Sequence, residues 1–320
     1  MQSDSLGSTE TLYSRLKRQS GNPMRDRYRI RANGASAIAL VWGIAIALAT
    51  LPSVAQIPPT SLDAIDIEPN PELDIERETE IDLAPEIDLA PELDGVDPEN
   101  FFRSGVEKAR RQDYEGAISD FDRLLELNPF DFRGYYNRAL ARAILGESEG
   151  AIDDLTEALE LNPFDPQMYN NRGILLYGTG DFSGAIDDYN QALKFNPNKV
   201  NTYYNRGLAR AQIGDIEEAI EDYTQAIQLD PNYAEAYNNR GIARAQINDL
   251  EGAIQDYTQA IRRNPDLALA YYNRGLARAL LGERQEALAD LQAAADRFLV
   301  QEDTANSQRV LETIQQLREI

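Results

Sequence analysis

The chain of 320 residues contains no cysteine and no histidine. Without cysteine there are no disulfides, thiolate metal ligands or cysteine nucleophiles, and without histidine there are no imidazole ligands and no catalytic triads with a histidine base. Because most hydrolytic and zinc chemistry depends on these groups, we predict no catalytic residues, no metal site and no cofactor. The 42% hydrophobic content is nevertheless that of ordinary folded material.

Basic residues are also scarce, with 31 Lys and Arg against 54 Asp and Glu and a net charge of −23. Residues 1–55 are the exception, since they carry seven basic and three acidic residues. Residues 56–97 carry 14 acidic residues and only one basic residue, Arg77. The remainder of the chain is acidic as well, and such a body repels phosphate backbones. Nucleic acid is therefore not an expected partner.

Long apolar runs are represented by a single uncharged stretch, ASAIALVWGIAIALATL, at residues 35–51. It follows the basic segment and precedes the small residues Ser53-Val54-Ala55, an order typical of a secretory signal cleaved after Ala55. A membrane span requires about 20 residues, so the run is short for an anchor. Three interpretations remain: a cleaved signal, an uncleaved signal anchor, or a buried core helix.

Residues 1–55 therefore form a predicted signal peptide or signal anchor, and in either case the chain after Leu51 is exported across the cytoplasmic membrane, periplasmic, secreted or held at its outer side. Membrane contact is expected only through residues 35–51, if they are not cleaved. Met24 precedes a compact basic segment, MRDRYRIRANG, and is thus a second candidate start beside Met1.

Residues 56–97 form an acidic segment that closes on IDLAPEIDLAPELDGVDP. Prolines interrupt helices and ladders, and like charges repel, which predicts a disordered linker. A second interpretation is a docking motif, in which the doubled IDLAPE offers alternating apolar and acidic side chains to a basic groove on a partner.

The rest of the chain repeats with a period of 34 residues. The octapeptide YYNRGLAR, for example, stands at 203–210 and again, two periods later, at 271–278. Each repeat contains two amphipathic stretches separated by a turn such as Gly180-Asp181 or Gly214-Asp215. Each of the first five repeats closes on a proline. Two further places recur in the repeats: one holds a small residue, and the other holds an aromatic residue or leucine. The closing prolines are Pro129, Pro163, Pro197, Pro231 and Pro265. The small residues begin with Ala117, Ala151, Ala185, Ala219, Ala253 and Ala287.

This pattern resembles the tetratricopeptide repeat (TPR). The resemblance implies an all-α fold, a right-handed α-solenoid of helical hairpins that stack because one hairpin cannot bury its apolar face alone. It covers residues 98–301 as six units: 98–131, 132–165, 166–199, 200–233, 234–267 and 268–301. Residues 302–320 lose the period but keep Val310, Leu311, Ile314 and Leu317 on one helical face, as a capping helix requires.

One place departs from the family, because arginine stands where the family has an apolar residue. These arginines are Arg138, Arg172, Arg206, Arg240 and Arg274. Each has one aspartate before it, in the preceding unit, and another at nearly the same separation after it, in its own unit. The aspartates are Asp120, Asp154, Asp188, Asp222, Asp256 and Asp290. Since an arginine at an apolar place needs a partner, we predict a structural ladder of Arg–Asp pairs. Pairs between units are favoured, and pairs within a unit are left open. A catalytic or anion-binding arginine is the alternative.

The resemblance implies that the first helix of each hairpin lines a concave groove for a peptide or a partner helix. Two rows are expected to face it. The first row is Phe102, Tyr136, Asn170, Tyr204, Asn238 and Tyr272, and the second is Val106, Leu140, Ile174, Leu208, Ile242 and Leu276. The adjacent Asn137, Asn171, Asn205, Asn239 and Asn273 add amides. The alternative is that these rows pack inside the array.

The leading functional hypothesis is a non-enzymatic scaffold, exported or anchored, that binds protein or peptide partners whose identity the sequence does not give. A cytoplasmic adaptor with the same repeats is one alternative. A carboxylate-based enzyme is another, since acidic pairs such as Asp153-Asp154 and Asp187-Asp188 are plentiful. Both pairs fall on repeated helical places, which favours solvated surface over an active site.

Overall fold

The computed structural model describes residues 97–319. The predicted signal or anchor, its cleavage site at Ala55, the second candidate start at Met24 and the acidic linker up to residue 96 lie outside the described residues.

Between residues 97 and 319 the chain forms thirteen helices and no strand. Two helices fall within each predicted unit, and one more follows the last unit. They are α3 (Pro98–Arg110), α4 (Tyr114–Leu127), α5 (Phe132–Ile144), α6 (Ser148–Leu161), α7 (Pro166–Thr179), α8 (Phe182–Phe195), α9 (Val200–Ile213), α10 (Ile216–Leu229), α11 (Ala234–Gln246), α12 (Leu250–Arg263), α13 (Ala268–Leu281), α14 (Arg284–Val300) and α15 (Thr304–Arg318).

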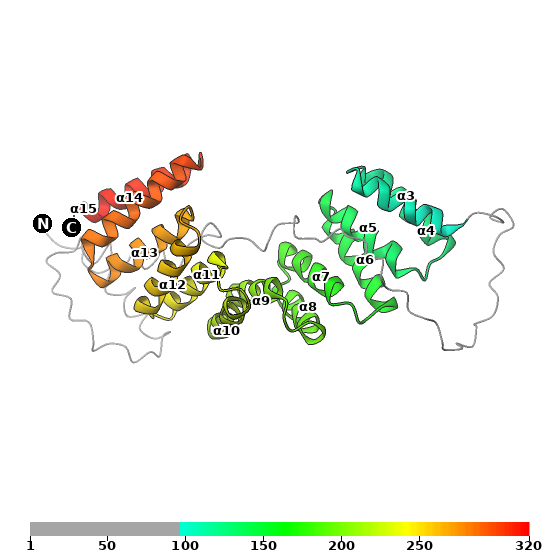
Figure 1. Cartoon of the computed structure of the whole chain (residues 1–320), viewed down its shortest axis with the longest axis horizontal. Helices are drawn as coiled ribbons and strands as arrows, with labels where there is room; N and C mark the ends of the chain where they lie inside the picture. The colour runs from blue at the N-terminus through cyan, green and yellow to red at the C-terminus, as the bar shows by residue number, and fades with distance from the viewer. Residues whose placement is uncertain (1–96, 320) are drawn as a thin grey trace, which may run out of the picture.

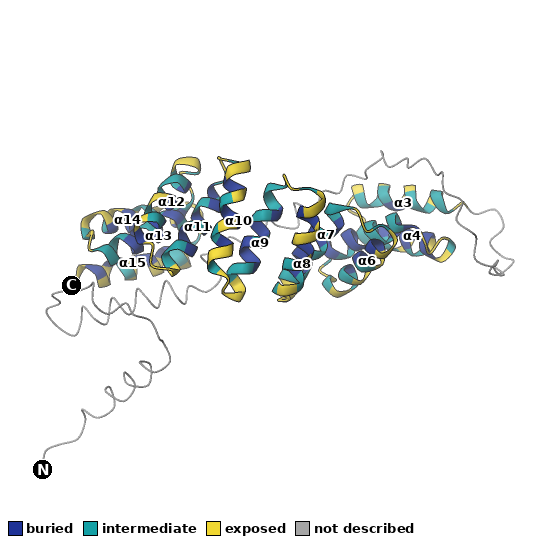
Figure 2. Ribbon diagram, turned by 90° about the horizontal axis from the view of Figure 1, so that it is seen from below, coloured by how far each residue is buried: buried dark blue, intermediate teal, exposed yellow. Residues whose placement is uncertain are grey.

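The helices stack in chain order into an all-α solenoid of repeats (Figure 1). In its middle, α7, α9 and α11 lie along the inner side of an arc, and α8 and α10 lie along the outer side. Buried residues form a band between the two layers, whereas exposed residues gather on the turns (Figure 2). Because first helices contact one another along the inner side, that side is shared by all units.

The helix boundaries follow from local chemistry. Aspartate side chains cap first helices: Asp97, Asp131 and Asp165 accept hydrogen bonds from backbone N–H groups two residues later. Gly180 and Gly214 end α7 and α9 in the left-handed conformation, with φ of 89° and 91°, which glycine adopts without steric cost. The chain therefore reverses sharply from each first helix into the second.

Within each hairpin the helices approach through a small residue that faces a large one. A Cβ atom at Gly207 would lie 2.8 Å from the ring of Tyr223, which is 1% exposed. Burial raises the pKa of Tyr223 well above its ordinary value, so its ring stays neutral. In unit 2, where the facing residue is the smaller Leu155, the small residue is Ala139. The size of the residue on the second helix thus limits the size of the residue that can face it on the first helix.

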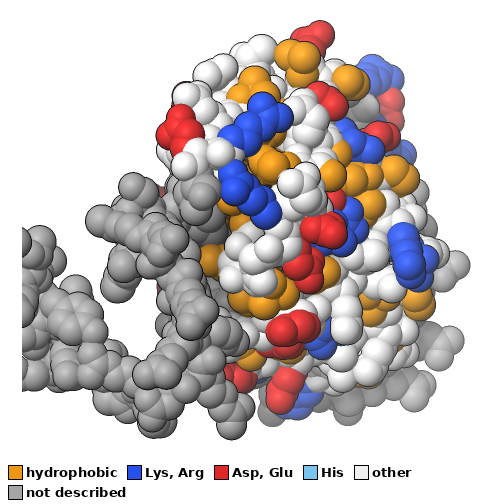
Figure 3. All heavy atoms as spheres, turned by 90° about the vertical axis from the view of Figure 1, so that its left-hand side faces the viewer, with side chains coloured by type: hydrophobic (Ala, Val, Ile, Leu, Met, Phe, Trp, Pro, Cys, Tyr) orange, Lys and Arg blue, Asp and Glu red, His pale blue; other side chains and the backbone are white. Residues whose placement is uncertain are grey.

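The last helix, α15, covers the apolar end of the array. Val310, Ile314 and Leu317 are buried against the core of the last unit. Leu311, predicted on the same face, is 43% exposed; that prediction was wrong, since one residue after Val310 the side chain has turned about 100° around the helix. The end of the molecule formed by the last helices presents charges of both signs among hydrophobic side chains (Figure 3). None of the helices described here has the length and apolar character that crossing a membrane requires.

Candidate functional site

The predicted ladder arginines of units 2 to 6 each donate two hydrogen bonds to one aspartate. Arg206 donates from Nε and Nη2 to the carboxylate oxygens of Asp222 at 3.0 and 2.6 Å. The other pairs with this geometry are Arg138–Asp154, Arg172–Asp188, Arg240–Asp256 and Arg274–Asp290. Every pair joins the two helices of one hairpin, so the prediction that the pairs run between units was wrong. The seam inside a hairpin brings the aspartate of the same unit closer than the one in the preceding unit.

The remaining nitrogen of each arginine, Nη1, does reach the preceding unit, but not its buried aspartate. Arg172 donates to the hydroxyl of Thr156 at 3.0 Å, and Arg206 donates to the amide oxygen of Asn190 at 2.6 Å. Thr224 and Thr258 accept in the same way from Arg240 and Arg274, and Asp122 accepts from Arg138. Contact between units at this place therefore depends mostly on neutral side chains.

A second cation faces the same aspartate in most units, and the sequence analysis missed it. Arg210, one helical turn after Arg206, donates to Asp222 at 2.8 Å. Its equivalents are Arg142, Arg244 and Arg278, and in unit 1 Lys108 lies 2.7 Å from Asp120. These cations could have been found in the sequence, because they recur with the same period as the first arginines and follow them by one helical turn. Unit 3 has Leu176 at this place.

Asp188 in unit 3 is consequently paired with Arg172 alone. Burial raises the pKa of Asp188, and the hydrogen bonds from Arg172 offset this only in part. The charge of this carboxylate is therefore disfavoured, and the cation that could compensate it is the one that Leu176 replaces.

The ladder is poorly suited to acid–base chemistry. Asp154 is buried and bonded to Arg138 and Arg142, whereas its neighbour Asp153 is exposed, so the two carboxylates of this pair do not face one site. Arg206 is further covered by Tyr203, whose ring centroid lies 5.5 Å from the guanidinium carbon. In the part of the chain that the structure describes, no cluster of three or more carboxylates is arranged to hold a metal ion.

The two rows predicted to face a partner are mostly inside the array. Of the twelve residues, nine are buried: Asn170, Tyr204, Asn238, Tyr272, Leu140, Ile174, Leu208, Ile242 and Leu276. Phe102, Tyr136 and Val106 are half-buried. The prediction that these rows form the contact surface was therefore wrong, and the packing alternative describes them. In unit 4, Tyr204 and Leu208 pack against the first helix of the next unit, and in unit 6, Tyr272 and Leu276 pack in the core that α15 closes.

The Tyr and Asn row instead joins neighbouring first helices through hydrogen bonds. Asn239 donates to the hydroxyl of Tyr204 at 2.9 Å, from one unit to the preceding one. Asn171–Tyr136 and Asn273–Asn238 repeat the contact between other units. Between units 3 and 4 the oxygen of Asn170 accepts from Thr202 instead, at 2.8 Å. Neither polar atom of the buried Asn205 side chain finds a partner among the described residues.

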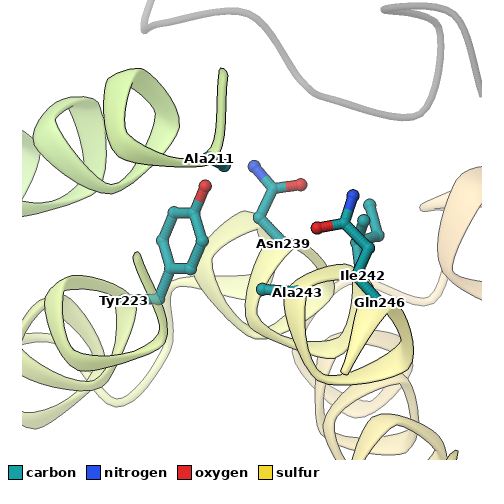
Figure 4. A pocket seen from close by; sticks show the side chains of 6 residues that line it. All are labelled: Ala211, Tyr223, Asn239, Ile242, Ala243 and Gln246. Atoms are coloured by element: carbon teal, nitrogen blue, oxygen red, sulfur yellow. The ribbon is translucent and has the colours of Figure 1, made fainter. Parts of the chain in front are cut away.

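A shallow hollow remains on the inner side, between α9 and α11 (Figure 4). Ala211, Ile242 and Ala243 supply its apolar wall, and the amides of Asn239 and Gln246 point into it. Gln246 is exposed. It lies one helical turn after Ile242, so it faces the inner side just beyond the row that was predicted.

Two sequence-family models match the chain. One, described as TPR repeat, matches residues 175–214, 207–248 and 243–282, and the other, described as tetratricopeptide repeat, matches residues 102–166. The chain belongs to the tetratricopeptide repeat family. None of the curated proteins matches this TPR chain.

Solved TPR structures share its fold. YrrB, described as a TPR protein with an unusual peptide-binding site, is 24% identical with a TM-score of 0.51, over 60% of this chain and 97% of YrrB. MamA from Desulfovibrio magneticus RS-1 is 21% identical with a TM-score of 0.51, over 54% and 98%. A TPR protein from Parabacteroides merdae is 18% identical with a TM-score of 0.54, over 69% and 98%. At these identities the likeness shows the fold alone.

The TPR array also carries exposed aromatic residues that the sequence analysis did not single out. Phe130 and Phe164, in the loops that join α4 to α5 and α6 to α7, are 74% and 71% exposed. Phe195 at the end of α8 is 37% exposed. The signal was available, because large apolar residues in the loops after the closing asparagine and proline have no partner within the hairpin.

Proposed function

We propose that this TPR protein is an exported or membrane-anchored scaffold that binds an extended peptide or a helix of a partner protein on its inner side. Membership of the TPR family and an arc lined by first helices support a protein-interaction role. The observation that carries the proposal is the hollow between α9 and α11, the place where the inner side combines an apolar wall with the exposed amide of Gln246.

The chemistry of the hollow suits a peptide backbone. The exposed amide of Gln246 has both a donor and an acceptor and so pairs with either group of a peptide bond. The amide of Asn239 is buried and already bonded to Tyr204 and Asn238. Because the wall is built from two units, the hollow depends on the stacking of unit 4 on unit 5. A peptide site is named for YrrB, a protein with this fold, which is consistent with the same use here.

Export rests on the sequence. The basic segment, the apolar run at residues 35–51 and the small residues ending in Ala55 have the order of a secretory signal. An array without cysteine or histidine needs neither disulfide formation nor metal supply outside the cytoplasm.

The proposed peptide site is tested by filling the hollow between α9 and α11. Peptides selected against the full chain from a displayed library are measured for affinity to the wild type and to Gln246→Trp, which places an indole in the hollow. We expect binding to weaken at least about tenfold, which corresponds to roughly 1.4 kcal/mol.

The matched control is Gln225→Trp, which changes an exposed glutamine on the outer helix α10 and is expected to leave affinity unchanged. Equal affinity of the selected peptides for all three proteins would place their binding site elsewhere. Loss of binding in both variants would indicate damage to the array instead of a filled groove.

A further inference from the structure

One edge of the array carries an exposed aromatic cluster built around Phe164 and Phe195. The rings of Phe164 and Phe195 meet edge to face with centroids 6.1 Å apart, and Tyr169 stacks on Phe195 at 6.1 Å. Leu161, 38% exposed, ends the helix that leads into the same loop. We call these four residues the edge cluster. Phe130 lies in the equivalent loop one unit earlier on the same edge.

The same places in later units show that the fold does not require these aromatic residues. Where units 1 and 2 have Phe130 and Phe164, the later loops have Asn198, Asn232 and Asp266. Where unit 3 has Phe195, units 5 and 6 have arginines. Arg263 and Arg297 bond there to the backbone carbonyls of Pro231 and Pro265. Unit 4 keeps an apolar residue there, Leu229, which is 38% exposed. The aromatic stretch of units 1 to 3 thus gives way to a polar edge in units 5 and 6, and such a local patch marks an interaction surface.

Two lysines stand close to Phe195 in the sequence, one directly before it and one four residues after it, on an otherwise acidic protein. Lys194 lies 5.8 Å from the ring centroid of Phe195, and Lys199 precedes α9 as its N-cap residue. Within residues 97–319, neither lysine has a carboxylate at ion-pair distance, unlike Lys108, which contacts Asp120. The surface therefore suits a ligand that alternates apolar side chains with carboxylates.

The chain itself supplies such a ligand at the same edge. Residues 81–94, IDLAPEIDLAPELD, contain five acidic residues, no basic residue, and Ile, Leu and Pro between them. The first described helix, α3, begins at the edge that holds the loops: Glu99 at its start bonds to Arg133 at the start of α5, at 3.0 Å. The chain thus joins the array on the side where the edge cluster lies.

We propose that residues 81–86, IDLAPE, bind in cis to the edge cluster, with their Ile, Leu and Pro side chains on Phe164 and Phe195 and their carboxylates on Lys194 and Lys199. The reach is sufficient. Packed helices lie about 8–10 Å apart, so the start of α7 is at most about 40 Å from the start of α3. The stretch from residue 81 to residue 97 spans up to about 50 Å when extended.

The absence of cysteine makes a clean distance measurement on the full chain possible. Spin labels are attached to cysteines introduced by Ala84→Cys in the acidic segment and Gln191→Cys, an exposed site one turn before Phe195 on α8. Pulsed electron resonance then gives the distribution of distances between the labels. We expect a narrow distribution, preserved when labelled chain is diluted with unlabelled chain, because the contact is within one molecule.

Two double variants disrupt the proposed surface in different ways, and a third double variant serves as the control. Phe164→Ser with Phe195→Ser removes the aromatic faces, and Lys194→Glu with Lys199→Glu reverses the charge while leaving the rings in place. Both are expected to lose the narrow peak. Leu299→Ser with Val300→Ser alters a similarly exposed apolar pair at the end of α14 (61% and 84% exposed) and is expected to keep it.

Three results would overturn the proposal: a wild-type distribution as broad as that of the two surface variants, a narrow peak that survives both variants, or a narrow peak that disappears on dilution. The last would assign the surface to a second copy of the chain. Circular dichroism of each variant separates loss of the contact from loss of the array.

Discussion

Each buried aspartate of the array is held by one or two cations, and the number differs between units. Asp222 accepts hydrogen bonds from Arg206 and Arg210, whereas Asp188 is paired with Arg172 alone because Leu176 takes the second place. At this scale the ladder is a set of separate ion pairs of unequal strength. Their contribution depends on how well each carboxylate is compensated after it leaves water.

Replacing these two aspartates by asparagine should have unequal costs. Asp222→Asn leaves two guanidinium groups short of a carboxylate, and breaking such a buried pair costs about 3 kcal/mol. Asp188→Asn affects one arginine and a carboxylate whose charge was already disfavoured, so we expect a cost smaller by at least about 1 kcal/mol. Urea unfolding of both variants at pH 7 measures the difference. Equal costs would show that the second arginine adds nothing.

Supplying the missing cation should change the pH dependence of unit 3. The folded-state pKa of Asp188 is raised by burial, so between its unfolded and folded values the native state binds more protons, and stability falls as pH rises through that window. Leu176→Arg should lower the pKa of Asp188 and remove this loss. Carboxyl carbon NMR titration of Asp188 measures the shift, and Asp222, which already has two arginines, is the internal reference. An unchanged Asp188 pKa would mean that the new side chain points away.

At the scale of the helix pair, the hairpin seam is fixed by complementary sizes. Gly207 and Tyr223 form one solution, and Ala139 with Leu155 forms another. Unit 6 combines Gly275 with Leu291, so glycine faces a leucine there, whereas alanine faces the equivalent leucine in unit 2. Helix propensity favours alanine over glycine by about 0.5–1 kcal/mol, so the seam decides whether a methyl group is tolerated.

Gly207→Ala should therefore destabilise the array, because its Cβ would lie 2.8 Å from a buried ring; overpacking of this kind costs about 1–3 kcal/mol. Gly275→Ala places its Cβ 3.0 Å from Leu291 and 3.2 Å from the backbone oxygen of Ala287, and we expect it to cost less than Gly207→Ala. Thermal unfolding of the two variants provides the comparison. A larger cost for Gly275→Ala would contradict this account of the seam.

At the scale of the whole molecule, the described array is a one-dimensional stack of hairpins. Stability in such a stack is approximately a sum over units and their interfaces. An ion pair inside a hairpin stabilises that unit, whereas the Asn and Tyr row contributes to the interface between units. The inner hollow and the edge cluster both depend on more than one unit, so both are properties of the stack.

Export should be visible in fractionated cells that express a C-terminally tagged chain. We expect recovery outside the cytoplasm, with a product that begins at Gln56 after cleavage, or at full length in the membrane if the signal is retained. The mass of the product also distinguishes a start at Met1 from one at Met24. A chain lacking residues 35–51 is the matched control and should stay in the cytoplasm. A soluble cytoplasmic product from the intact chain would refute export and leave a cytoplasmic adaptor.

The sequence period was enough to determine the all-α repeat fold and the places of the turns. It did so because helical hairpins bury their apolar faces only by stacking, which leaves the same small and large residues in every unit. It also identified the arginines and aspartates that meet. These features depend on residues near in sequence or on regular repetition, and both are visible in one chain.

The tertiary structure alone decided the partners and the exposed surface. Asp188 and Asp222 flank Arg206 at nearly equal separations in the sequence, and only the crossing of two helices brings Asp222 nearer. Likewise, Tyr204 and Leu208 have the spacing of an outward-facing stripe, yet the first helix of the next unit covers them. Burial depends on neighbours a whole unit away in the sequence, and their approach is set by packing that no local pattern records.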